Sequence, residues 1–373
     1  MPARMLECIY LQGYKSFREL KLTLGPVNVL IGANGSGKSN LISLFKMLNR
    51  MMNEELQLHI AQSGGPDQLL HYGRKTTQSV HIGLWFRRDT NLANGYNCQL
   101  VPAEDHLLIA CEQIYFHDRS RYEWPYLDKI HSGIFTESQL PQWASESGGI
   151  ARYVFEAMQS WQVYHFHDTS DAARVKQMGD ILENRHLLPD AGNLAAYLYL
   201  LREKHPQRYR NIVETIRLAA PFFGDFILRP HPFNAEKIRL EWRERGSDLT
   251  FSAGALSDGT LRFICLATLF LQPPENLPAT IVLDEPELGL HPYAIVLLAE
   301  MVHSVAQHTQ VILATQSVPL VNQFAPEEIL VLDRPGGVST IRRLEQAEIA
   351  HWLDEYGLGD LWEKNVLGGR PAL

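Results

Sequence analysis

The chain has 373 residues, of which 45% are hydrophobic and 20% are charged, an ordinary globular composition with room for about two domains. Its formal net charge of −8 disfavours a protein that coats itself with nucleic acid, although a local basic face remains compatible with it. No apolar run reaches the length of a membrane span and the N-terminus is charged, so we expect a cytoplasmic protein without a membrane partner. The four cysteines form no CxxC pair, which argues against a zinc site or a disulfide framework.

The first predicted elements flank a glycine-rich turn. Residues 20–24 alternate leucine with polar residues, as in a half-buried strand, and residues 26–31 (PVNVLI) form an apolar run that predicts a buried strand. Residues 40–50 (NLISLFKMLNR) carry apolar side chains at helical spacing. Between them, residues 32–39 read GANGSGKS, the Gly-x₄-Gly-Lys-Ser pattern of a phosphate-binding loop.

This loop predicts a site for ATP and Mg²⁺. Glycines let the backbone wrap around phosphates, and the free N–H groups at the start of the following helix favour an anion. We expect Lys38 to reach the β- and γ-phosphates and the Ser39 hydroxyl to bind Mg²⁺. The residues expected to contact the nucleotide here are Asn34, Gly35, Ser36, Gly37, Lys38, Ser39 and Asn40.

The middle of the chain is less regular. Residues 79–86 and 107–116 are predicted to be extended, and Asn94-Gly95 between them is a typical hairpin-turn signal. Helical patterns occupy residues 151–161 and 193–219, and His165 and His167 lie on a predicted strand without the partners of a metal site.

Regular alternation returns after residue 222. Strands are predicted at 226–228, 237–242, 280–283 and 310–314, helices at 259–271 and 293–305, and a last hairpin at residues 335–337 before an acidic tail with tryptophans. Apolar strands separated by helices indicate an α/β fold with a mostly parallel sheet covered on both faces. We divide the chain into an N-terminal ATPase part (1–117), a mainly helical insertion (118–221), a C-terminal ATPase part (222–345) and a tail (346–373).

Two carboxylates close the predicted strand at 280–283. Asp284 and Glu285 follow that strand directly, and the carboxyl end of a buried strand faces the nucleotide in such sheets. We expect Asp284 to hold Mg²⁺ through water, together with Ser39. Glu285 is the expected general base for the attacking water.

Further motifs carry a family resemblance. Residues 256–260 (LSDGT) look like the ABC signature, residues 283–292 (LDEPELGLHP) like a Walker B segment with its D-loop, and residues 314–317 (ATQS) lie where ABC ATPases carry a switch histidine. With the opening GYKSF at 13–17 and the tail from Gly359 to Gly369, the chain resembles the RecF-like, ABC-type AAA-family ATPases of bacteria. The resemblance implies an ABC-type P-loop head with an antiparallel β subdomain and a compact helical insertion.

The resemblance also implies a mechanism. In such heads two copies enclose two ATP molecules, so a homodimer forms through the nucleotide sites. By this match Ser257 and the Gly259 N–H contact the γ-phosphate held by the other subunit, and Gln316 acts at the switch position. A hydroxyl and free N–H groups at a helix start are chemically suited to an anion.

The chain departs from the family pattern at three places. Asp258 and Thr260 replace the glycine and glutamine of the common LSGGQ signature. Gln316 replaces the switch histidine, and because an amide cannot titrate we expect slow hydrolysis or a sensing role. The glutamine that lines the nucleotide in related heads has no secure counterpart, and Gln113 is one candidate among several.

Three functions remain open from the sequence. The first is an ATP-hydrolysing switch in DNA maintenance, repair or anti-phage defence, with a partner nuclease or other effector and with DNA as a further partner. The second is an ATP-gated scaffold for a nuclease or toxin with little hydrolysis. The third is a transporter cassette, which the variant signature and the long separation of Ser39 from Ser257 oppose.

Overall fold

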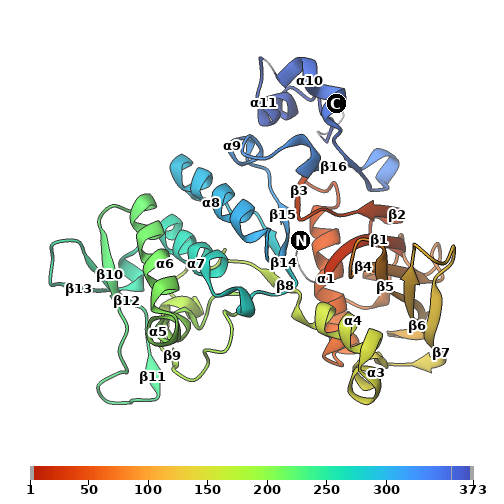
Figure 1. Ribbon diagram of the computed structural model, residues 1–373, viewed down its shortest axis with the longest axis horizontal. Coiled ribbons are helices and arrows are strands. Elements are labelled where there is room, and N and C mark those ends of the chain that lie inside the picture. The colour runs from red at the N-terminus through yellow and green to blue at the C-terminus, as the bar shows by residue number, and fades with distance from the viewer. Residues whose placement is uncertain (1–3, 354, 370–373) are drawn as a thin grey trace.

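The computed structural model describes residues 4–353 and 355–369, and its centre is a six-stranded, mostly parallel sheet (Figure 1). The strand order is β17-β16-β3-β15-β14-β8, and only the edge strand β17 runs antiparallel to its neighbour. The bounds are β3 Val27–Ile31, β8 Gln162–Tyr164, β14 Thr280–Asp284, β15 Gln310–Ala314, β16 Ile329–Asp333 and β17 Thr340–Arg343. Three predicted strands, β3, β14 and β15, and the predicted last hairpin are present.

The two faces of this sheet pack against different cores, which explains the unbroken apolar strands. Val29 and Leu313 face the helices of the C-terminal half, whereas Leu30 and Ile312 face α1 and the antiparallel sheet. Since successive strand residues point to opposite faces, a strand covered on both sides needs an apolar residue at nearly every position. The expected α/β class with a covered parallel sheet is therefore confirmed.

A second, antiparallel sheet covers one of these faces beyond α1. Its strand order is β2-β1-β4-β5-β6-β7. The bounds are β1 Met5–Tyr14, β2 Phe17–Thr23, β4 Val80–Arg87, β5 Leu92–Ala103, β6 His106–Asp118 and β7 Tyr126–Phe135. The helices on this side are α1 Lys38–Met52, α2 Leu56–Gln62, α3 Leu140–Ser147 and α4 Gly149–Ser160.

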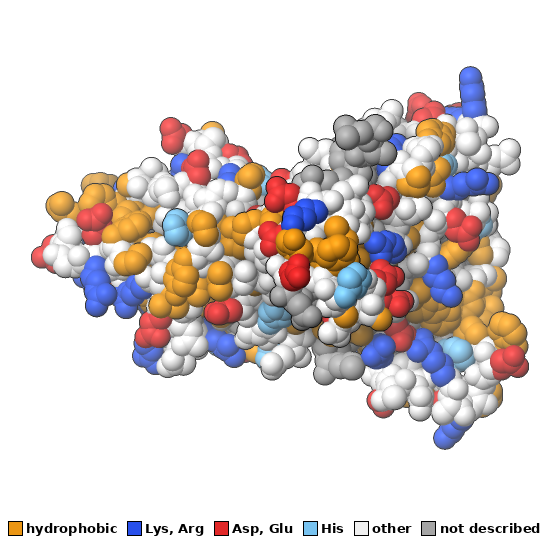
Figure 2. Space-filling view, turned by 90° about the horizontal axis from the view of Figure 1, so that it is seen from above, with side chains coloured by type: hydrophobic (Ala, Val, Ile, Leu, Met, Phe, Trp, Pro, Cys, Tyr) orange, Lys and Arg blue, Asp and Glu red, His pale blue; other side chains and the backbone are white. Residues whose placement is uncertain are grey.

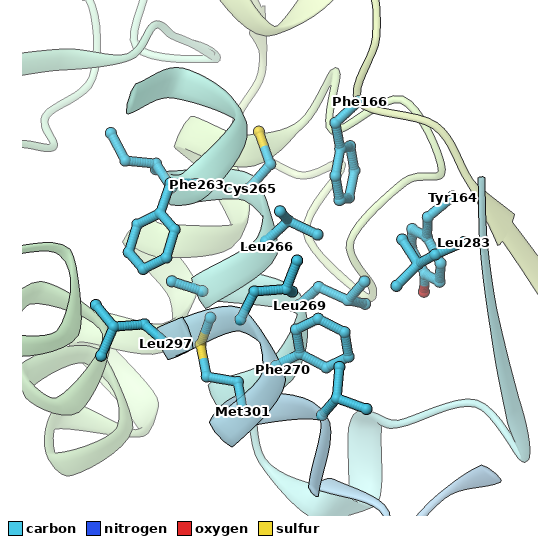
Figure 3. Close-up of a cluster of buried hydrophobic side chains, with 14 of the residues drawn as sticks. Tyr164, Phe166, Phe263, Cys265, Leu266, Leu269, Phe270, Leu283, Leu297 and Met301 are labelled. Atoms are coloured by element: carbon cyan, nitrogen blue, oxygen red, sulfur yellow. The ribbon is translucent and has the colours of Figure 1, made fainter. Parts of the chain in front are cut away.

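The opposite side is a helical lobe, on the left in Figure 1. Its helices are α5 Leu194–Lys204, α6 Pro206–Ala219, α7 Asp258–Leu271 and α8 Pro292–Val305, with α9 Val318–Val321, α10 Gln346–Leu353 and α11 Leu358–Glu363 following. Short strands β9 Gly179–Asp180, β10 Phe223–Ile227, β11 Lys237–Ile238, β12 Glu241–Glu244 and β13 Thr250–Ser252 complete it. Figure 3 shows how Phe263, Leu266 and Phe270 of α7 pack with Met301 of α8 and with Leu283 of β14. This cluster fixes the helix that carries the predicted signature against the central sheet.

Several local predictions were wrong. Asn94-Gly95 is not a turn but lies within β5, where Gly95 is opposite Trp85. A Cβ at Gly95 would come within 2.7 Å of the Trp85 ring, so packing across strands requires this glycine. The predicted helix at 193–219 breaks at His205 before Pro206, and the predicted strand at 237–242 is divided into β11 and β12.

The segment expected to be a helical insertion also contributes to both main sheets. β7 extends the antiparallel sheet through its pairing with β6, and β8 pairs in parallel with β14. His165 and His167 follow β8 rather than lying on it. The domain boundaries after residues 117, 221 and 345 therefore stay a prediction from the sequence. No helix among residues 4–353 and 355–369 is long and apolar enough to cross a bilayer.

Candidate functional site at the carboxyl edge of the parallel sheet

The glycine-rich loop turns from β3 into α1 as the sequence predicts. Gly35 and Gly37 have φ values of 79° and 118°, in the left-handed region where glycine is favoured, and Gly37 caps α1. A Cβ at Gly37 would come within 2.5 Å of the Ser339 hydroxyl. The loop therefore needs glycine both for its backbone conformation and for its tight packing.

Residues distant in sequence hold this loop in place. The buried Ser339 hydroxyl donates to the Ser36 carbonyl over 2.6 Å, and the Arg334 guanidinium donates to the Gly35 carbonyl over 3.3 Å. The amide of Asn40 donates to the hydroxyl of Ser16, which comes from the GYKSF segment. The opening segment and the β16–β17 hairpin thus support the loop together, and the Ser339 and Ser16 hydroxyls are hydrogen-bonded over 2.7 Å.

The loop fits a phosphate ligand. Lys38 is buried, and its ammonium group donates to the carbonyl oxygens of Gly32 and Ala33 inside the loop. Burial lowers the pKa of Lys38, while the nearby carboxylates of Glu285 and Asp284 oppose that shift. The Ser36 hydroxyl is buried without a hydrogen-bond partner among the described residues, and Ser39 is exposed at the start of α1. An anion in the loop would give these donors their missing partner.

A cavity of about 580 Å³ lies beside the loop. Its lining includes Lys15, Ser16, Asn40, Tyr72 and Arg334. It therefore combines residues that hold the glycine-rich loop with a tyrosine and two cations, a lining suited to the rest of a nucleotide.

Asp284 and Glu285 end β14 at the same edge of the sheet. Burial raises the pKa of Asp284, the neighbouring Glu285 raises it further, and His167 and Lys38 oppose the shift. Glu285 has a φ of 44°, a strained conformation for a residue with a side chain, and its N–H donates to the Ala314 carbonyl over 2.8 Å. A divalent cation beside this pair would relieve the electrostatic cost of two adjacent carboxylates.

Gln316 reaches the same carboxylates from the end of β15. Its side-chain amide donates a hydrogen bond to the Glu285 carboxylate. The neighbouring Thr315 hydroxyl donates over 2.5 Å to Glu287, whose pKa burial raises. The structure therefore brings together Lys38, Asp284, Glu285 and Gln316, which lie at or after the carboxyl ends of three adjacent parallel strands, β3, β14 and β15.

The predicted signature lies elsewhere, at the start of α7 in the helical lobe (Figure 1). Ser257 is exposed, and its Oγ caps α7 by accepting the Thr260 N–H over 3.2 Å. Gly259 packs directly on the loop after β14, because a Cβ there would overlap the Gly289 carbonyl. The structure thus does not bring Ser257 to its own glycine-rich loop.

The sequence did not predict the place of two residues beside the site, Arg262 and His167. The Arg262 guanidinium donates to the carbonyls of Phe166 (3.0 Å), His167 (2.9 Å) and Leu288 (2.6 Å). His167 follows β8, the parallel neighbour of β14, and acts electrostatically on Asp284. Gln113, by contrast, lies within β6 of the antiparallel sheet and accepts a hydrogen bond from Tyr115, so it is not at this edge. The sequence placed His167 on a predicted strand but not beside Asp284, and no pattern marked Arg262, because both positions depend on β8.

Comparison with known proteins agrees with this architecture. The family model described as "AAA domain, putative AbiEii toxin, Type IV TA system" matches residues 27–84 and 157–322. The "OLD nuclease" of Thermus scotoductus (strain ATCC 700910 / SA-01) is 23% identical over 409 residues, which span 99% of this chain and 71% of that protein.

Solved structures of SMC heads have a similar fold. The Smc head bound to the C-winged helix domain of ScpA superimposes with a TM-score of 0.61 at 15% identity, over 92% of this chain and 99% of that chain. The Smc head with an extended coiled coil bound to the C-terminal domain of ScpA, derived from Pyrococcus furiosus, gives a TM-score of 0.58 at 16% identity, over 95% and 99%. The ABC-type head fold expected from the motifs is therefore confirmed.

Proposed function

The chain belongs to the family of AAA domains described as putative AbiEii toxins of type IV toxin–antitoxin systems, and on that premise we propose that it is an ATP-hydrolysing dimeric switch. Membership makes it an ATPase of the AAA/ABC P-loop type. The observation that carries the proposal is the meeting of Lys38, Asp284, Glu285 and Gln316 at one edge of the sheet.

Each residue of this edge has a role in the proposed ATP site. The backbone N–H groups of residues 34–40 and the Lys38 ammonium bind the phosphates. Ser39 and, through water, Asp284 hold Mg²⁺, which neutralises phosphate charge when bound. Lys38 now bonds to carbonyls of its own loop and exchanges those partners for phosphate oxygens.

Glu285 is the proposed general base. It takes a proton from the attacking water, and its strained backbone fixes the direction of its carboxylate. Gln316 orients that carboxylate through its amide and contacts the water or the γ-phosphate. Because the amide cannot accept a proton at neutral pH, turnover is slow.

Two copies of the chain complete the two sites. Ser257 is exposed at the start of α7 in the helical lobe, apart from the glycine-rich loop of its own chain, which supports a role for Ser257 and the Gly259 N–H toward the nucleotide of a second subunit. Arg262 and Gly259 join this helix start to the loop after β14, so that the signature moves together with the carboxylates of its own site.

We place this switch in defence or DNA maintenance, acting with an effector protein. The family description and the name of the Thermus relative point to toxin and nuclease systems, and two of the similar SMC heads are bound to ScpA domains. Figure 2 shows Lys and Arg side chains interspersed with Asp and Glu over the face seen from above, a distribution that favours a protein partner over direct DNA coating. DNA remains the second candidate partner.

The alternative function is an ATP-gated scaffold with little hydrolysis. The non-titrating amide at Gln316 supports it, because binding and dimerisation need no titrating group at the switch position. A single-turnover assay of phosphate release separates the two: release that depends on Glu285 supports the switch, and none under saturating ATP supports the scaffold.

The first test of the proposal is nucleotide binding. Lys38→Ala should abolish tight binding of a fluorescent ATP analogue with Mg²⁺, since the phosphates lose the ammonium of the loop. Lys46→Ala, which removes an exposed lysine of the same helix, is the matched control and should leave the affinity unchanged. Equal affinities of wild type and Lys38→Ala would refute the ATP site.

A further inference from the structure

The segment after α10 bridges two parts of the candidate ATP site. It contains α11, followed by residues 364–369, and α11 lies beside α9 in Figure 1. The α9 helix begins at Val318, directly after Gln316 and its capping residue Ser317. The other end of the segment reaches the glycine-rich loop.

At the first end, glycine allows very close contact between the helices. The Gly359 N–H donates to the Asn322 side-chain oxygen over 2.6 Å. A Cβ at Gly359 would overlap the Val318 carbonyl and would lie 2.9 Å from the Val318 side chain. The tail is thus joined to the first turn after the Gln316 loop.

At the second end, Gly369 joins the loop to β16. Its carbonyl accepts the Ala33 N–H over 2.5 Å, and its N–H donates to the Asp333 carboxylate over 2.8 Å. Gly369 has a φ of 78°, and a Cβ there would lie 3.0 Å from the Val331 side chain. Only glycine adopts this conformation in this space without strain.

Part of the stretch between these ends is buried and hydrogen-bonded, whereas residues 363–366 are exposed. Leu361 and Leu367 are 0% and 1% exposed, and Arg342 donates to the Leu367 carbonyl over 2.7 Å. A segment held in this way is a fixed part of the domain rather than a frayed end.

Gly369 and the Lys38 side chain both form hydrogen bonds with the same peptide unit of the loop. The peptide that joins Gly32 to Ala33 accepts from the Lys38 ammonium through its carbonyl and donates to Gly369 through its N–H. Because the peptide unit is planar, one bond on each side fixes its orientation. When the Lys38 ammonium moves to a phosphate, the hydrogen bond from the Ala33 N–H to the Gly369 carbonyl remains and still fixes the orientation of this peptide plane.

We propose that residues 358–369 form a strap that positions the glycine-rich loop relative to the Gln316 loop, with Gly369 as its positioning residue. The inference rests on the proposed ATP site. The strap keeps the loop in its binding conformation before nucleotide arrives, so that less ordering is needed on binding. Its loss should weaken nucleotide affinity about 5- to 10-fold, the effect of one hydrogen bond.

The test compares Gly369→Ala in the full chain with Gly246→Ala. Gly246 has nearly the same φ, 79°, but a Cβ there meets nothing within 4 Å, so the control carries the same backbone strain away from the site. Asp333→Ala, which removes the acceptor of the Gly369 N–H, is the second variant in case Gly369→Ala fails to fold. Thermal unfolding verifies that each variant is folded.

Two readouts are needed. Hydrogen exchange of the Ala33 amide without nucleotide should be faster in Gly369→Ala and Asp333→Ala than in wild type and Gly246→Ala. The Kd for a fluorescent ATP analogue should rise about 5- to 10-fold in the same two variants. Unchanged exchange at Ala33, or faster exchange with unchanged affinity, would overturn the positioning role. If the proposed ATP site is wrong, wild-type protein will bind no nucleotide, whereas exchange at Ala33 will still be faster in Gly369→Ala and Asp333→Ala.

Discussion

The side-chain amide of Gln316 donates a hydrogen bond to the carboxylate of Glu285. The two residues follow neighbouring parallel strands, β15 and β14, whose register places Ala314 opposite Asp284. A hydrogen bond that a carboxylate accepts restrains the rotation of that carboxylate. The pair therefore joins the proposed general base to the residue that replaces the switch histidine.

Glu285→Gln tests the base. We expect nucleotide affinity to be retained and the rate of hydrolysis to fall about 10²- to 10⁴-fold, because the amide keeps the shape but cannot accept a proton. Single-turnover phosphate release measures the rate, and Glu300→Gln, an exposed glutamate of α8, is the control. A wild-type rate in Glu285→Gln would mean that another group accepts the proton.

Gln316→His tests the departure from the family pattern. If Gln316 only positions the water and the Glu285 carboxylate, an imidazole that can donate in the same place should support equal or faster turnover. Steady-state kinetics with thermal unfolding checks this expectation. Complete loss of turnover in a folded variant would show that the loop depends on the amide itself.

Asp284→Asn should stabilise the nucleotide-free protein at neutral pH. The pKa of Asp284 is raised above its unfolded value, so the stability it contributes is present below about pH 4 and is lost as pH rises through the folded pKa. Because asparagine does not ionise, the variant loses no stability at this position as pH rises. Melting temperatures should therefore be higher for the variant than for wild type at pH 7 and should converge near pH 4. A lower melting temperature of the variant at pH 7 would contradict the raised pKa of Asp284. The same variant should show weaker Mg²⁺ dependence of nucleotide binding.

Arg262→Ala should weaken dimerisation more than nucleotide binding. The change leaves three backbone carbonyls without their donor and should destabilise the monomer by about 1–3 kcal/mol. Since those carbonyls lie after β8 and β14, the start of α7 loses its link to the site. Light scattering with ATP should report less dimer, while the Kd for nucleotide stays within about twofold; Arg262→Lys should be intermediate. Equal dimer formation in wild type and Arg262→Ala would contradict the link.

The features that the sequence predicted correctly are encoded by residues close together in the chain. The glycine-rich loop is encoded within eight residues, and β3 and β15 are apolar at all positions but Asn28 and Gln310 because both of their faces are covered. The positions of Asp284 and Gln316 follow from β14 and β15, since parallel strands end at the same edge.

The parts that sequence reasoning missed depend on contacts between distant segments. β8 has three residues and ends just before the strand that was predicted around His165 and His167. Its pairing with β14, which brings His167 near Asp284, was not predictable from local pattern. Asn94-Gly95 resembled a turn because the Trp85 ring that requires Gly95 comes from another strand. Gly369 likewise gains its role only through Ala33 and Asp333.

The central claim, a head-to-head ATP dimer, is tested most directly by Ser257→Arg in a Glu285→Gln background. With ATP and Mg²⁺, light scattering should show Glu285→Gln as a dimer relative to its nucleotide-free state. Adding Ser257→Arg should return it to monomer, because a bulky cation at the start of α7 would overlap the partner's nucleotide. Ser252→Arg, at an equally exposed serine of β13, should leave the dimer intact. A particle whose size and ATPase rate are both unaffected by Ser257→Arg would contradict the dimer, and the chain would then be a P-loop ATPase without a shared site.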